Sequence, residues 1–308
     1  MRALITGGAG FIGSHLAAHF RARSEAVRVL DNLATGNRRN ISGLDVEFIE
    51  GSILDRALVT RAMHGVDCVF HLAAFVSVPK SVSDPRACVE TNVTGLLNVL
   101  EAAADAHVEK FCFASSAAVY GDNPVVPKRE DMAPEPASPY AVTKLDGEFY
   151  CRQFTDSGRL NAVALRFFNV FGPRQDPSGP YGAAVPIFFR EALAGRPITI
   201  FGDGGQTRDF IYVQDAVGAL DFAAGDARLN GVFNVGYGGQ ITVLELAQRI
   251  LALTGSQSTV QFAPARAGDV RNSCASVDRL RSAGWRPAAT LGQGLERTLA
   301  SLRATPAG

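Results

Sequence analysis

The chain has 308 residues, of which 30 are basic and 30 acidic, and 47% are hydrophobic. This length can bury a large core, in one α/β unit or in two closely joined lobes. Because the charge is balanced and no basic run is longer than Arg38-Arg39, nucleic acid and membrane surfaces are not expected as partners.

The first 36 residues carry the pattern of a dinucleotide-binding segment. An apolar strand, Arg2-Ala-Leu-Ile-Thr6, is followed by the glycine run Gly7-Gly-Ala-Gly10-Phe-Ile-Gly13 and by a helical pattern at 14–20. Glycines at this spacing allow a tight turn and bring the backbone close to a pyrophosphate at the helix N-terminus. A second strand, 26–30, ends in Asp31, whose carboxylate can bind ribose hydroxyls and repels a 2′-phosphate.

Strands and helices continue to alternate along the first 170 residues. The predicted strands are 46–49, 67–70, 110–114 and 161–166, and the predicted helices are about 55–64, 85–106 and 139–157. This alternation indicates a parallel, doubly wound α/β sheet of the Rossmann type, whose ligands bind beyond the carboxyl ends of the strands. Motifs follow the strands as this fold requires, at Leu72-Ala-Ala74, Ser115-Ser116 and Phe167-Phe-Asn169.

The regular alternation of predicted strands and helices ends at a Pro/Gly-rich connector, residues 172–180. Beyond it the sequence predicts a helix at 184–194, an apolar segment at 198–201, a strand at 210–213, and amphipathic helices near 242–253 and 290–302. We therefore expect a nucleotide-binding domain at 1–172, with part of 208–236 packing on it, and a smaller lobe at 173–308.

The segment Ser138-Pro-Tyr-Ala-Val-Thr-Lys144 places a tyrosine four residues before a lysine on a predicted helix. Both side chains then share one helix face, where the Lys144 ammonium can lower the pKa of Tyr140 and let it act as a general base. Ser116, at a strand end, could donate to a developing oxyanion or relay its proton. A serine in that place could equally serve only to satisfy backbone groups.

Six segments together resemble the extended short-chain dehydrogenase/reductases, and among them the UDP-glucose and UDP-N-acetylglucosamine 4-epimerases. They are Thr6-Gly-Gly-Ala-Gly-Phe-Ile-Gly-Ser14, His71-Leu-Ala-Ala74, Ser115-Ser-Ala-Ala-Val-Tyr-Gly121, Ser138-Pro-Tyr-Ala-Val-Thr-Lys144, Arg166-Phe-Phe-Asn-Val-Phe-Gly-Pro173 and Thr207-Arg-Asp-Phe210. The resemblance implies a tightly held NAD, which takes hydride from C4 of a UDP-sugar and returns it to the other face after the 4-keto intermediate rotates. It also implies a homodimer formed through the helices at 85–106 and 139–157.

The resemblance assigns catalysis to Ser116, Tyr140 and Lys144, with Lys144 also binding the nicotinamide ribose. It places NAD against Gly7, Gly10, Phe11, Ile12, Gly13, Asp31, Asn32, Thr35, Gly36, Ser52, Ile53, Leu72, Ala73, Ala74, Asn92, Tyr140, Lys144 and Phe168. Ser52 stands where the family usually has an aspartate at the adenine.

The resemblance also assigns roles to the residues that are expected to bind the UDP-sugar. Asn169, Arg208 and Arg266 would hold the diphosphate, Phe201 would stack on uracil, and Asp269 would bind the uridine ribose. The remaining residues expected to contact the UDP-sugar are Ser115, Ser116, Tyr140, Ala184, Thr199 and Ser273. The small Ser273 would leave room at sugar C2 for an N-acetyl group.

Neighbouring activities can be compared at single positions. Sugar-nucleotide 4,6-dehydratases carry an Asp-Glu pair where this chain has Ala117 and Ala118, and methyl groups cannot shuttle protons. The missing glutamate also disfavours UDP-glucuronate decarboxylation. UDP-glucuronate 4-epimerase stays open as an alternative substrate assignment, and a dinucleotide-binding protein without catalysis stays open as an alternative class.

The five cysteines are widely spaced and contain no Cys-x-x-Cys, and the five histidines lack metal-ligand spacing. The sequence therefore indicates neither a disulfide framework nor a metal site. Glycines interrupt the only N-terminal apolar run, so we expect no signal peptide, no membrane span and a cytoplasmic location.

Overall fold

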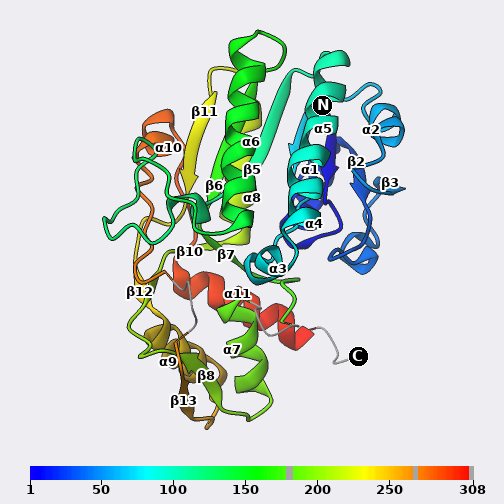
Figure 1. Cartoon of the computed structure of the whole chain (residues 1–308). Coiled ribbons are helices and arrows are strands. Elements are labelled where there is room, and N and C mark those ends of the chain that lie inside the picture. Colours follow the sequence, from blue (N-terminus) through cyan, green and yellow to red (C-terminus); the bar gives the residue numbers. More distant parts are fainter. Residues whose placement is uncertain (178–182, 266–269, 305–308) are drawn as a thin grey trace. The chain divides into compact units, whose positions relative to one another are not determined.

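The computed structural model describes residues 1–177, 183–265 and 270–304. The chain forms two compact units (Figure 1). Unit 1 comprises Met1–Val119, Pro136–Phe167 and Val217–Phe233, and unit 2 comprises Tyr120–Glu135, Phe168–Ala216 and Asn234–Gly308.

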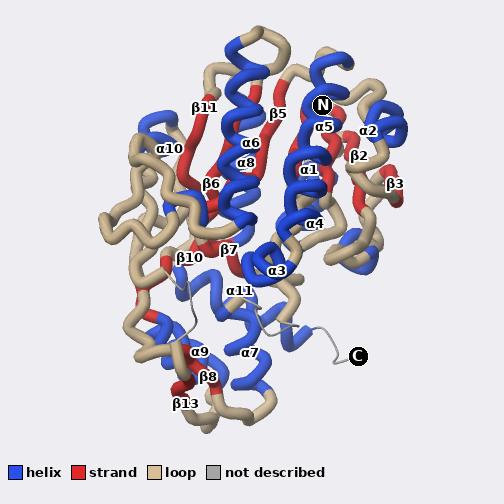
Figure 2. The backbone as a smooth tube through the Cα atoms, viewed as in Figure 1, coloured by secondary structure: helices blue, strands red, loops and turns tan. Residues whose placement is uncertain are grey.

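Unit 1 is built on a seven-stranded sheet, whose strands are the red stretches of tube in the upper part of Figure 2. Its strand order is β11-β6-β5-β4-β1-β2-β3. The strands are β1 (Arg2–Thr6), β2 (Ala26–Asp31), β3 (Glu47–Glu50), β4 (Cys68–His71), β5 (Lys110–Ser116), β6 (Ala162–Phe167) and β11 (Gly231–Val235). Every residue of β4 and β6 is buried, as expected for parallel strands covered on both faces.

Helices cover both faces of this sheet. They are α1 (Phe11–Ala22), α2 (Arg56–Ala62), α3 (Val78–Ser83), α4 (Pro85–Val89), α5 (Gly95–Asp105), α6 (Pro139–Asp156) and α8 (Val213–Gly225), with short helical turns η1 (Arg38–Ile41), η2 (Glu90–Thr94) and η3 (Ala117–Tyr120). One core joins the strands to α2, α5 and α6, through side chains such as Val59, Leu100 and Phe154. On α1, Phe20 packs on Phe70 of β4, with ring centroids 5.1 Å apart.

Unit 2 contains short sheets and four helices among its described residues. Its elements are β7 (Asn169–Phe171), α7 (Ala184–Leu193), β8 (Ile198–Phe201), β9 (Thr207–Arg208), β10 (Phe210–Tyr212), β12 (Ile241–Thr242), α9 (Val243–Thr254), β13 (Val260–Ala263), α10 (Asp278–Ala283) and α11 (Leu291–Ala304). Strands β7 and β10 are parallel, as are β8 and β13, whereas β9 and β12 are antiparallel.

The predicted doubly wound parallel sheet is confirmed, with strand ends within two residues of those expected. The expected single helix at 85–106 is wrong in detail. It divides into α4, the π-helical turn η2 and α5, and Asn92 lies in that turn. The amide of Asn92 accepts the Phe75 N–H at 2.7 Å and donates to the Phe75 carbonyl at 3.1 Å, which holds a loop beside the turn.

Each unit is built from more than one stretch of the chain. Residues 120–135 belong to unit 2, and 217–233 return to unit 1 and lead into its edge strand β11. Which unit binds which ligand stays a prediction. In the described parts of the chain, no helix has the length and apolar character needed to cross a bilayer.

Candidate active site

The glycine run forms a close turn between β1 and α1. Gly7 has φ +71°, and a Cβ on it would lie 2.7 Å from the backbone nitrogen of Ala73. A Cβ on Gly13 would overlap the carbonyl oxygen of Gly7. Helix α1 begins at Phe11 with Gly10 as its N-cap, and that residue supplies no side-chain cap. The first-turn N–H groups of α1 can therefore serve an anion such as a diphosphate.

Hydrogen bonds to Asp31 link the glycine run to the turn after β2. Its carboxylate accepts the Ala9 N–H at 2.9 Å and the Leu33 N–H at 2.8 Å. A Cβ on Gly36 would lie 2.9 Å from either carboxylate oxygen, so the turn requires a glycine there. Because a carboxylate offers about four lone-pair directions, Asp31 can still accept ribose hydroxyls. These residues fit the adenosine end of NAD.

The other predicted NAD residues lie along the same edge of the unit 1 sheet. Leu72 and Ala73 donate backbone bonds to the carbonyl (3.1 Å) and hydroxyl (3.3 Å) of Thr6. Ser52 accepts the Leu54 N–H at 3.1 Å, and Ile53 is buried. The remaining predicted positions, Phe11, Ile12, Asn32, Thr35 and Ala74, occupy the start of α1 and the loops after β2 and β4.

Helix α6 brings Tyr140 to the end of β5. Ser138 caps the helix by accepting the Ala141 N–H at 3.2 Å, and Pro139 occupies its first turn, so Tyr140 stands at the helix start. The Ser116 hydroxyl lies near enough to the phenol of Tyr140 to lower its pKa. The predicted catalytic residues Tyr140, Ser116 and Lys144 are thus together in unit 1.

Lys144 lies one helical turn after Tyr140, and it is 4% exposed. Its Nζ lies 5.8 Å from the centroid of the Tyr140 ring. Burial lowers the pKa of Lys144 to about 8.

The expected lowering of the Tyr140 pKa by Lys144 is wrong for this structure. Part of the Tyr140 side chain is accessible, yet the surrounding protein desolvates its hydroxyl. Burial raises the pKa of Tyr140, and the nearby Ser116 hydroxyl lowers it by less. Desolvation of the phenolate therefore outweighs the stabilisation that the contacts supply.

Two predicted residues make internal contacts that the sequence did not indicate. Asn92 donates to the hydroxyl of Thr143 at 3.0 Å, which links η2 to α6. Ser115 is 4% exposed and donates to the carboxylate of Glu148 at 2.5 Å. Glu148 carries no recognisable motif apart from its place four residues after Lys144 on the same helix face.

In unit 2 the predicted residues gather around the segment 207–209. Asn169 donates to the carbonyl of Asp209 from its backbone N at 3.0 Å and from its side chain at 3.2 Å. Ser273 donates its backbone N–H to Thr207 at 3.2 Å. Phe168 is buried, with its ring 6.3 Å from that of Tyr120.

Further predicted residues of unit 2 lie on β8, β9 and α7. Arg208 forms part of β9, and its guanidinium donates to the Thr207 carbonyl at 2.8 Å. Thr199 accepts a 2.8 Å bond from Gln261. Phe201 ends β8 and Ala184 begins α7. Arg266 and Asp269 lie outside the described residues.

The sequence analysis missed Asp209, a buried carboxylate beside Arg208. It accepts backbone N–H bonds from Tyr237 at 2.8 Å, Gly238 at 3.0 Å and Ala275 at 2.9 Å. Burial raises the pKa of Asp209 to about 6. The carboxylate holds two loop segments of unit 2, at 237–238 and at Ala275, beside the chain at Arg208.

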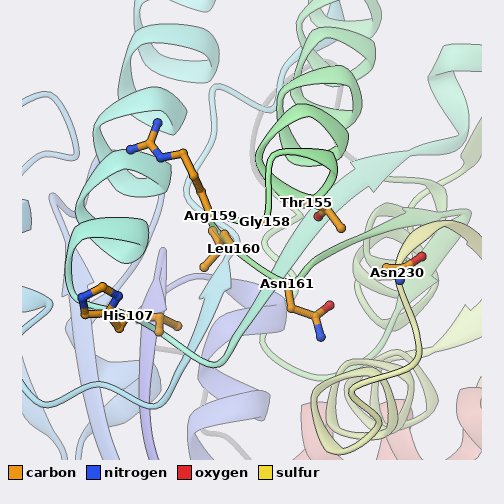
Figure 3. A pocket seen from close by; sticks show the side chains of 8 residues that line it. His107, Thr155, Gly158, Arg159, Leu160, Asn161 and Asn230 are labelled. Carbon is orange, nitrogen blue, oxygen red and sulfur yellow. The ribbon is translucent and has the colours of Figure 1, made fainter.

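A hollow of about 360 Å³ lies in unit 1 near the amino ends of β5, β6 and β11 (Figure 3). Several of its polar side chains already have partners within the protein. Arg159 stands over the Phe154 ring at 4.7 Å, and Asn161 donates to Ala227 at 2.8 Å while accepting from Lys110 at 3.1 Å. In Figure 3, Arg159 and Asn161 point in opposite directions. We do not assign the active site to this hollow, because the predicted residues lie at the carboxyl ends of the strands.

Residues 3–236 match the family model described as the NAD dependent epimerase/dehydratase family. The chain belongs to this family. The match contains the glycine run, Asp31, Ser116, Tyr140 and Lys144, and it confirms the family that the motifs predicted.

Relatives extend over nearly the whole chain. A UDP-glucose 4-epimerase of Mycolicibacterium smegmatis is 40% identical, covering 98% of this chain and 99% of that protein. The crystal structure of UDP-glucose 4-epimerase from Thermotoga maritima, with UDP-glucose, matches with TM-score 0.94 and 39% identity over 99% of both chains. The UDP-N-acetylglucosamine 4-epimerase of Methanobrevibacter ruminantium matches with TM-score 0.95 and 36% identity over 98% of both chains.

NAD is present in another similar structure. The Thermus thermophilus UDP-glucose 4-epimerase in complex with NAD has TM-score 0.92 and 41% identity, covering 98% of this chain and 99% of that one. The family also contains other chemistries, since a dTDP-glucose 4,6-dehydratase from Streptomyces venezuelae matches with TM-score 0.92 and 31% identity over 99% of this chain and 97% of that one.

Proposed function

We propose that this protein is an NAD-dependent 4-epimerase of UDP-hexoses. It interconverts UDP-glucose and UDP-galactose, and also UDP-N-acetylglucosamine and UDP-N-acetylgalactosamine. The observation that carries this proposal is the grouping of Tyr140 and Lys144 at the end of β5. The Lys144 Nζ lies 5.8 Å from the Tyr140 ring centroid and 2.8 Å from the carbonyl of Ala114, two residues before Ser116.

Oxidation of a C4 alcohol requires a base to take the hydroxyl proton. Tyr140 is that base, because its phenol lies at the end of β5 near a second hydroxyl, that of Ser116. Ser116 donates a hydrogen bond to the C4 oxygen while the proton of the C4 hydroxyl passes to Tyr140 in its phenolate form. Bound NAD supplies the hydride acceptor and donor, and the glycine run, Asp31 and Lys144 are the residues that would hold it.

Epimerisation is favoured over dehydration at two positions. Ala117 and Ala118 form the start of η3, directly after Ser116. Elimination of water from the sugar needs a further acid and base, and alanine provides neither. These two alanines therefore support epimerisation rather than dehydration as the activity.

The substrate residues of unit 2 are part of the same proposal. Arg208, Arg266 and Asn169 bind the diphosphate, and Phe201 stacks on the uracil, since guanidinium groups match phosphate oxygens. Asp269 binds the uridine ribose, while Thr199 and Ala184 line the nucleotide site. Ser273 borders sugar C2, and its small side chain admits the N-acetyl group.

The chain is also proposed to form a homodimer through α4 and α6. Val89, Val142 and Phe149 are 47%, 42% and 50% exposed, so these helices present apolar side chains to solvent. Apolar patches of this kind are typical of oligomer interfaces. Light scattering of Phe149→Glu should show a monomer where the parent shows a dimer. We place the dimer in the cytoplasm, where its five buried cysteines, all free, stay reduced.

The decisive experiment incubates the purified protein with UDP-glucose, UDP-N-acetylglucosamine and UDP-glucuronate separately, without added NAD. Turnover of the first two supports the proposal, and mass analysis of the supernatant after denaturation should find NAD rather than NADP. Turnover of UDP-glucuronate alone would instead identify a UDP-glucuronate 4-epimerase. Bound NAD with no turnover of any of the three would identify a dinucleotide-binding protein without catalysis.

A further inference from the structure

A buried ion pair joins α6 to strands β5 and β6 in unit 1. The guanidinium of Arg166 donates to Glu148 through Nε at 2.8 Å and through Nη2 at 2.7 Å. Both side chains are 4% exposed. The Ser115 hydroxyl donates a third bond to the same carboxylate, at 2.5 Å. The proposed chemistry at Tyr140 makes no direct use of Glu148 or Arg166.

The position of this network relates it to the reactive groups. Tyr140, Lys144 and Glu148 follow one another at intervals of four residues, so they share one face of α6. In the sheet, Ser115 of β5 pairs with Arg166 of β6, and the next pair in the register is Ser116 with Phe167. Glu148 thus anchors the helix of Tyr140 to the strand residue that precedes Ser116.

A buried ion pair contributes little net stability compared with apolar side chains of the same volume, because desolvation offsets the attraction. A bidentate Arg–carboxylate pair instead fixes the position of its two side chains relative to each other, because it tolerates little displacement of either one. The hydrogen bond from Lys144 to the Ala114 carbonyl is a second directional contact between α6 and β5, near the start of the helix. The apolar contacts between them, such as Gly147 against Phe113, are not directional. They oppose separation of helix and strand but resist sliding only weakly.

We propose that Glu148 is a positioning residue, which with Arg166 fixes α6 along β5 and so keeps the phenol of Tyr140 in register with Ser116. The inference rests on the proposed catalytic role of Tyr140. Without the bidentate pair between Glu148 and Arg166, α6 can shift along β5 while unit 1 stays folded. The Tyr140 hydroxyl then moves away from Ser116, and proton transfer slows.

The test replaces both charges by apolar side chains of similar size in the double variant Glu148→Met/Arg166→Met. This change leaves no unpaired buried charge, so the melting temperature should stay within about 4 °C of that of the parent. Turnover should fall at least about tenfold while KM for UDP-glucose changes less than about twofold.

A second readout does not depend on turnover. The phenolate absorbance of each protein, minus that of its Tyr140→Phe counterpart, reports the titration of Tyr140 alone. Because the nearby Ser116 hydroxyl lowers the pKa of Tyr140, its displacement should move the titration midpoint to higher pH. If the parent turns over no UDP-sugar, the proposed function fails, and this midpoint still decides the positioning role.

The matched control is Arg28→Met, which removes another buried arginine of unit 1. Arg28 donates to the Ala62 carbonyl at 2.6 Å and pairs with Glu47 at 2.8 Å. It should lower the melting temperature and leave turnover and the Tyr140 midpoint unchanged. A folded double variant with the turnover and the midpoint of the parent would overturn the proposal. If the double variant does not fold, Glu148→Asp takes its place, because aspartate keeps the negative charge on a shorter side chain. Turnover and the Tyr140 titration midpoint are then the two readouts.

Discussion

Lys144 donates a 2.8 Å hydrogen bond from its Nζ to the backbone carbonyl of Ala114. This bond holds a cation of α6 against β5, two residues before Ser116, with Nζ 5.0 Å from the Phe113 ring centroid. A carbonyl acceptor favours the charged form of lysine, while burial lowers its pKa to about 8. Lys144 is therefore mainly cationic at neutral pH and is held in place near Tyr140.

Replacing Tyr140 by phenylalanine should abolish most turnover. The ring packing is kept, but the group that takes the C4 proton is removed, which costs a factor of about 10² to 10⁴. Initial rates with UDP-glucose measure the loss. Tyr150→Phe, on the same helix, is the control and should keep the activity of the parent. A Tyr140→Phe enzyme within a factor of two of the parent would show that another group is the base.

Ser273→Tyr should narrow the substrate range. A tyrosine beside sugar C2 leaves space for a hydroxyl but overlaps an N-acetyl group, and the hexose must also rotate during the cycle. Activity on UDP-N-acetylglucosamine should disappear while that on UDP-glucose persists. Ser273→Ala, the control, should keep both activities. If the tyrosine variant loses both activities in parallel, the assignment of Ser273 to the sugar pocket is wrong.

Asp209 should make stability depend on pH in a defined window. Its pKa is raised to about 6 by burial, so the folded state binds the proton more tightly than the unfolded state does. The stability from this group is complete below about pH 4 and is lost as the pH rises through about 6, by up to about 3 kcal/mol. The free energy of unfolding of the parent, minus that of Asp209→Asn, should fall across this range. A difference independent of pH would contradict the raised pKa.

Gly147→Ala should destabilise unit 1 although alanine favours helices. A Cβ at this position would lie 2.6 Å from Cε1 of Phe113 and 3.0 Å from Cδ2 of Leu96, both buried. Overpacking costs about 1–3 kcal/mol and the helix preference of alanine returns about 0.5–1 kcal/mol, so a net loss remains. Urea unfolding measures it. Gly292→Ala, where a Cβ meets open space in α11, should be neutral or stabilising.

The sequence predicted those parts of the fold that depend on patterns among residues close together in the chain. Alternating apolar strands and helices located the sheet, and the spacing of Tyr140 and Lys144 predicted their common helix face. The location of Ser116 after β5 agrees with the rule that ligands bind at the carboxyl ends of parallel strands, from which the sequence analysis expected the motifs to cluster there.

Features that depend on distant partners could not be predicted in this way. The π-turn at Asn92 depends on contacts with Phe75 and Thr143, which are remote in sequence. Asp209 and Glu148 look like surface carboxylates until the fold supplies their donors. The sign of the Tyr140 pKa shift also needed the structure, since helix spacing gives the approach of Lys144 but not the degree of desolvation.

The return of the chain to the unit 1 sheet has a consequence for its synthesis. Strand β6 ends at Phe167, but its outer neighbour β11 starts only at Gly231. While a ribosome makes the intervening residues, β6 is an open edge made entirely of side chains that are buried in the finished protein. Such an edge readily pairs with another nascent chain. Slow translation of this interval, or a premature stop within it, would therefore expose the cell to aggregation.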